Sequence, residues 1–101
     1  MAIVEVSVVP LGTEKPSVSK YVARAIKVLQ QEKDITYEIT AMGTIIEGDL
    51  DRILAAAKKM HEVVFAEGAT RVLTTIKIDE RRDKPQTMKA KLDSVKRKLQ
   101  A

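Results

Sequence analysis

The side chains whose types suggest chemistry gather on one short stretch, residues 35–49, together with one serine near the N-terminus. They comprise two carboxylates, a methionine and three hydroxyls: Ser7, Glu38, Thr40, Met42, Thr44 and Glu47. A carboxylate accepts hydrogen bonds from ring N–H or amino groups, methionine offers a polarisable contact, and a hydroxyl fixes orientation. Because such a set suits a flat, partly cationic ring, we predict that these residues bind a small molecule.

The two carboxylates also have a plainer interpretation. In an ordinary hairpin Glu38 and Glu47 would be solvated, and they would need a hydrogen-bond partner or a cation only if a second subunit buried them. The chain has no cysteine and a single histidine, His61, so a metal site would have to use carboxylates. We expect His61 to be a helix residue at the edge of the core.

Motifs of catalysis are missing from the sequence. It contains no nucleophile elbow, no phosphate-binding glycine loop and no HExxH. We therefore predict a binding protein rather than an enzyme, with no metal and no cofactor.

The stretch 35–49 is predicted to be a β-hairpin. Apolar and polar residues alternate strictly over 35–40, and the alternation resumes over 44–47. Gly43 lies at the break, where we expect it to take positive φ. Asp49 is the predicted N-cap of the helix that follows.

Two more strands and three helices complete the pattern. We predict strands over 3–10 and 71–80, a helix that follows Ser17 and fades near Lys33, a second helix from Leu50 with Gly68 as its C-cap glycine, and a last helix over 86–99. The order is β-α-β-β-α-β with an extra C-terminal helix. This order predicts a ferredoxin-like α+β sandwich, in a single domain over residues 1–101.

Both main helices of such a sandwich cover the same face of the sheet. The predicted covered face is apolar: Val4, Val6, Val8, Tyr37, Ile39, Val72 and Ile76. The predicted open face mixes apolar with hydrogen-bonding side chains: Glu5, Ser7, Val9, Thr36, Glu38, Thr40, Met42, Leu73, Thr75 and Lys77, with Ile45 and Glu47. Since an exposed apolar patch usually marks an interface, we expect a second subunit to stack on this open face.

The net charge of +4 is concentrated in the C-terminal segment, because residues 81–101 hold eight Lys/Arg and two Asp/Glu. A basic helix could bind nucleic acid or an acidic membrane surface, but such a run of charge is more often the solvated face of a terminal helix. The chain has only three aromatic residues (one Phe and two Tyr) to stack on bases. No apolar run approaches the roughly 20 residues of a membrane-spanning helix, and the N-terminus lacks a basic region before its apolar run. We expect a cytoplasmic protein that binds neither nucleic acid nor membrane.

Four segments resemble the thiamine-binding protein family: VVPLGT at 8–13, SVSKYVA at 17–23, MGTIIEGD at 42–49 and RVLTTIKIDERRDK at 71–84. The resemblance extends over nearly the whole chain, and MGTIIEGD and KIDERRDK are its more specific parts. It implies a ferredoxin-like fold in dimers of paired sheets that stack into tetramers. It also implies that the ligand is thiamine or its hydroxymethylpyrimidine moiety.

The resemblance also implies roles for individual residues. Glu47 would pair with the aminopyrimidine, Met42 would pack on a ring, and Ser7 and Thr40 would supply hydroxyls. Two other functions remain open from the sequence, a regulatory oligomer that binds a different small metabolite and an RNA-binding protein. The near balance of charge over residues 1–80 speaks against RNA binding, since ten Lys/Arg there face twelve Asp/Glu.

Overall fold

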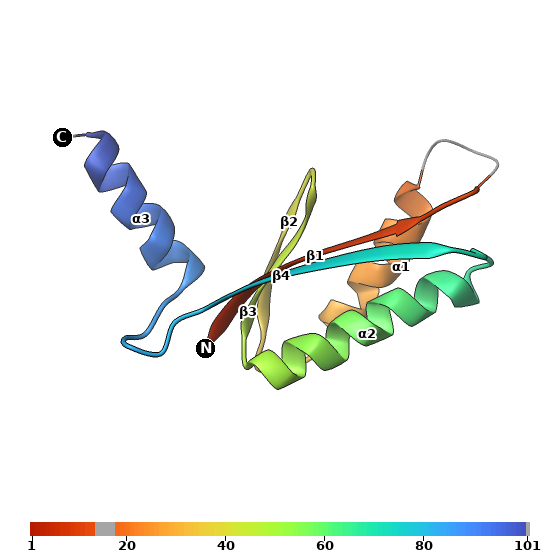
Figure 1. Cartoon of the computed structure of the whole chain (residues 1–101), viewed down its shortest axis with the longest axis horizontal. Coiled ribbons are helices and arrows are strands. Elements are labelled where there is room, and N and C mark those ends of the chain that lie inside the picture. Colours follow the sequence, from red (N-terminus) through yellow and green to blue (C-terminus); the bar gives the residue numbers. More distant parts are fainter. Residues whose placement is uncertain (14–17, 101) are drawn as a thin grey trace.

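A computed structural model describes residues 1–13 and 18–100 of the chain. Its elements are β1 (Ala2–Pro10), α1 (Ser19–Gln30), β2 (Thr36–Thr40), β3 (Gly43–Gly48), α2 (Leu50–Ala66), β4 (Val72–Glu80) and α3 (Met88–Leu99). The strands form one antiparallel sheet in the order β2-β3-β1-β4 (Figure 1). The predicted ferredoxin-like α+β fold with an additional C-terminal helix is confirmed.

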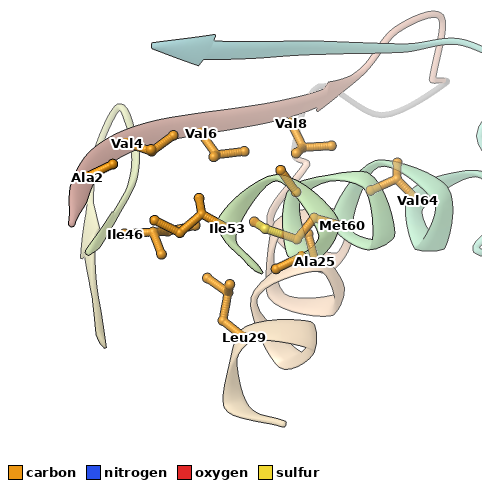
Figure 2. Packing of buried hydrophobic residues seen from close by; sticks show 12 residues of the cluster. Ala2, Val4, Val6, Val8, Ala25, Leu29, Ile46, Ile53, Met60 and Val64 are labelled. Carbon is orange, nitrogen blue, oxygen red and sulfur yellow. The ribbon is translucent and has the colours of Figure 1, made fainter. Parts of the chain in front are cut away.

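Helices α1 and α2 lie together on one side of the sheet (Figure 1). Strand register assigns the side chains to the two faces, since residues directly opposite each other in antiparallel strands share a face. Val4 lies between Ile46 and Ile78 across the sheet. Side chains of β1 and β3 point from this face toward the two helices (Figure 2), and they form the core with Leu29, Ile53 and Met60. The predicted covered face is therefore the face that the helices cover.

The ends of the helices follow local signals where such signals exist. Asp49 caps α2 as predicted, because its carboxylate accepts a hydrogen bond from the Arg52 N–H at 3.2 Å. Gly68 takes φ +107 just beyond the end of α2, as expected for a C-cap glycine. Helix α1 ends at Gln30, earlier than predicted, and Asp34 then takes φ +65, outside helical geometry. The predicted cap Ser17 lies outside the described residues.

The β2–β3 turn differs from prediction in one respect. Gly43 does not have positive φ; the glycines that do, among the described residues, are Gly12, Gly48 and Gly68. Gly43 relieves crowding instead, because a Cβ at this position would lie only 3.1 Å from the Val6 carbonyl oxygen, closer than an ordinary contact. The turn thus sits directly against β1.

The last helix starts later than predicted, at Met88, because Thr87 is its N-cap. The Thr87 hydroxyl accepts a hydrogen bond from the Ala90 N–H at 3.0 Å. No helix in the described part of the chain is both long and apolar enough to cross a membrane.

Two isoleucines of the hairpin provide a test of this arrangement. Ile46 is fully buried under the helices, whereas Ile39 on the same face is 59% exposed. Ile46→Ala should lower the free energy of unfolding by about 2–5 kcal/mol, because it removes core contacts and leaves a cavity. Ile39→Ala should cost no more than about 1 kcal/mol. Urea unfolding measures both, and equal losses would contradict the burial seen here.

Candidate functional site

The candidate site begins where two neighbouring strands part. Strand β1 pairs with β4 as far as Pro10, but its pairing with β3 ends at Val6 opposite Thr44. Beyond Val6, the edge of β1 that faces β3 pairs with no strand among the described residues. The β2–β3 turn lies beside this unpaired edge and leaves a pocket there.

This pocket has a volume of about 190 Å³ and lies between β1, α1 and the β2–β3 turn. Its lining is mainly apolar and includes Val6, Val8, Val22, Ala25, Ile26, Ile39 and Met60. An apolar concavity with a few polar groups is typical of small-molecule sites. It is smaller than the roughly 300–1,000 Å³ of sites for drug-sized ligands, so it suits a single ring.

Four of the six predicted binding residues line this pocket: Ser7, Thr40, Met42 and Thr44. Thr44 lies on the helix-covered face and is only 4% exposed. Neither the Thr44 nor the Ser7 hydroxyl makes a hydrogen bond within the described part of the chain. The Thr44 hydroxyl can therefore bond a ligand in the pocket without first breaking a contact of the protein. Ser7 alternates with Val6 and Val8, so its side chain points to the open face instead.

The other two predicted binding residues in the pocket, Thr40 and Met42, differ from what the sequence indicated. The Thr40 hydroxyl donates to the Gly43 carbonyl at 2.7 Å and accepts from the N–H groups of Met42 and Gly43 at 3.2 Å. It therefore holds the turn rather than remaining free for a ligand. Met42 is 83% exposed in the turn, so the expectation that it lies on the open sheet face was wrong.

The two predicted carboxylates lie in a different place. Glu38 and Glu47 both belong to the open face and line a groove of about 380 Å³ between the sheet and α3. Thr44 and Glu47 are three residues apart on one strand, so they point to opposite faces. A single pocket containing Met42, Thr44 and Glu47 is therefore not formed within one chain.

Glu47 has a structural contact in this groove. One of its carboxylate oxygens, Oε2, accepts a hydrogen bond from the Met88 N–H at 3.1 Å. Met88 is the first residue of α3, where N–H groups lack partners within the helix and a negative charge is favourable. Lys91 of α3 pairs with Asp79 on the same face. Glu47 and Asp79 flank Ile3 in one row across the sheet, so together they anchor the first turn of α3.

The histidine is a core-edge helix residue, as predicted. His61 is partly buried on α2, with Nδ1 2.6 Å from the Thr74 hydroxyl and its ring edge-to-face with Phe65. Among the described residues, no group of three or more His, Asp or Glu side chains could hold a metal ion.

The sequence profile of the thiamine-binding protein family matches residues 4–96. The chain belongs to this family. The YqgV protein of Bacillus subtilis is 48% identical, with 99% of both chains aligned. The solved structure of MJ1052 from Methanocaldococcus jannaschii is 47% identical, with a TM-score of 0.86 over 93% of this chain and 94% of that one. A Thermotoga maritima structure, provisionally assigned to thiamine biosynthesis or salvage, shares the fold at 22% identity, with a TM-score of 0.78 over 93% and 97% of the two chains.

The contacts that hold the first turn of α3 on the sheet should shift the pKa of the Asp79 carboxyl. The hydrogen bond from Lys91, with the nearby Gln86 amide, lowers the pKa of Asp79 below 3.8. Since the pKa is lowered in the folded state, the ion pair stabilises the anchor above pH 3.8 and is lost as the pH falls through the lowered value. Lys91→Ala should return the pKa of Asp79 toward 3.8, whereas Lys89→Ala should not. An NMR titration measures both, and an unchanged pKa in Lys91→Ala would contradict the anchor.

Proposed function

We propose that this protein binds thiamine or its hydroxymethylpyrimidine moiety without catalysing a reaction, and that the ring occupies the pocket between β1, α1 and the β2–β3 turn. Membership of a family of binding proteins supports the binding role. The observation that carries the location is the apolar pocket itself, with the unpaired Thr44 hydroxyl on the helix-covered face of the sheet. The provisional assignment of the T. maritima protein agrees with the ligand class, although that likeness concerns the fold.

The chemistry of the pocket suits a substituted pyrimidine. Its apolar lining takes up the ring faces, and the Thr44 hydroxyl can donate to a ring nitrogen or accept from the amino group. Because the volume suits one ring, the second ring of thiamine would lie at the mouth. There the exposed Met42 offers its polarisable sulfur to the cationic thiazolium.

The ligand would also lie close to a subunit interface. Ser7 and Thr40 belong to the open sheet face, so the pocket reaches this face at the end of the sheet. A second copy stacked on the open face would border the bound ligand. Glu38 and Glu47 would then contribute only if the ligand extends along the open face toward α3.

Titration calorimetry with thiamine and with hydroxymethylpyrimidine tests the ligand and its location. Thr44→Val keeps the side-chain shape but removes the hydroxyl, so affinity should fall between roughly twofold and tenfold. Glu38→Gln should leave affinity unchanged and is the control. No heat with either ligand would contradict the proposed function. If Glu38→Gln or Glu47→Gln weakens binding and Thr44→Val does not, the ligand lies in the α3 groove.

We further propose that the protein is a homotetramer with the open face inside it. Leu73 lies opposite Val9 on this face and is 56% exposed. Burying such a side chain contributes about 1.5–3 kcal/mol in every subunit.

Leu73→Glu should split the tetramer without loss of secondary structure, because it places a charge within the stacked faces. Ala55→Glu, on the exposed side of α2, is the control and should leave the assembly intact. Light scattering measures the mass of the assembly for the wild type and both variants. A monomeric wild-type protein at micromolar concentration, or an unchanged mass for Leu73→Glu, would show that the open face is simply solvated.

A further inference from the structure

The C-terminal helix α3 carries an apolar stripe with little to cover it. The stripe consists of Met88, Leu92, Val95 and Leu99, and no residue of α3 is buried. Leu99, at its far end, is 78% exposed. In Figure 1, α3 begins near one end of the sheet and projects away from α1 and α2. Among the described residues, the hydrogen bond and ion pair from α3 to the sheet come from its first turn, and the stripe beyond this turn leaves Leu92, Val95 and Leu99 more than half exposed.

The charges beside the stripe restrict what this surface can be. At 100° per residue, Lys91 and Lys98 lie along one side of the stripe, and Lys89 and Lys96 lie along the other. A second α3 packed on the stripe would bring lysines against lysines, which is unfavourable. The surface that fits should therefore be apolar and bear unpaired carboxylates.

The open face of the sheet has this character. Strand register places Glu38, Ile45, Glu5 and Lys77 in one row across it. Among the described residues, Glu5 and Glu38 form no ion pair. Besides Ile45 within this row, the open face has Ile3 in the next row toward the α3 anchor, and Val9 and Leu73 two rows away in the other direction. Stripe and face are thus complementary in both apolar character and charge.

Within one chain, α3 borders its own open face only at one end, where Leu92 and Lys96 line the same groove as Glu38 and Glu47. Its anchors, Glu47 and Asp79, belong to the last row of side chains on the open face, and the helix points outward from there (Figure 1). It enters the space on the open-face side, where a stacked copy would lie. Reaching back across its own sheet would break the Met88 and Lys91 contacts.

We propose that α3 of one copy packs its apolar stripe on the open sheet face of a second copy, with its lysines beside Glu5 and Glu38 of that face. This inference rests on the self-association proposed above and adds the segment that makes the contact. It explains why a helix with an exposed apolar stripe is bonded to the sheet at its first turn. By symmetry, each copy would both supply a helix and receive one.

Charge in the stripe tests the proposal. Val95→Asp combined with Leu99→Asp should raise the dissociation constant of the assembly at least tenfold, measured by light scattering across a dilution series. Ala90→Asp is the control, because this exposed residue lies on the side of α3 away from the stripe. An assembled wild type whose mass is unchanged in the double variant overturns the role of α3 but leaves the association intact. A monomeric wild type overturns both the role of α3 and the association. If that monomer co-floats with anionic lipid vesicles in a density gradient, the stripe binds a membrane instead.

Cross-linking identifies the contact surface, since the chain has no cysteine of its own. A Leu99→Cys protein is mixed with a Leu73→Cys protein under mild oxidation, so every mixed disulfide joins two chains. The matched control mixes Leu99→Cys with Lys58→Cys, whose position is exposed on α2 away from the open face. The proposal predicts several-fold more cross-linking to position 73 than to position 58. Equal yields, or a higher yield at 58, would overturn it.

Discussion

The candidate site exists because the two edges of strand β1 are paired over different lengths. Its ladder with β4 runs to Pro10, whereas its ladder with β3 stops at Val6. If β3 continued alongside β1, the sheet would close the space that the pocket occupies. Because it does not, the β2–β3 turn lies against β1 and leaves an apolar hollow in front of α1. Beyond Val6, this edge of β1 pairs with no strand in the described part of the chain, so it lies open to the pocket.

A second constraint follows from the architecture. Two helices cover one face of the four-stranded sheet and leave the other open, so the buried core lies entirely on one side. The open face then has to be solvated or covered by another molecule. Its apolar residues and its unpaired carboxylates favour a cover that is itself apolar and basic. The anchored helix α3 combines both properties, so the same constraint connects the sheet, the C-terminal helix and the proposed assembly.

Alternation alone predicted the two faces of the sheet, because the face of a strand residue depends only on its parity. The same rule separates Thr44 from Glu47, so the expectation of a shared pocket failed by relying on closeness in sequence. Other features have no local signal. The contact between Glu47 and Met88 joins residues 41 positions apart, and the early end of the β1–β3 ladder depends on where the turn packs. Thr40 lay on a predicted strand end, where nothing indicated that its hydroxyl would close the turn.

The most direct test of the account is an NMR titration of nitrogen-labelled protein with hydroxymethylpyrimidine. If the ring enters the pocket, the amide signals that move most should be those of Val8, Ile39 and Thr44, which surround it. Shifts confined to Glu38, Met88 and Lys89 would place the ligand in the groove under α3 instead. Either that pattern or an unchanged spectrum at saturating ligand would contradict the proposed site.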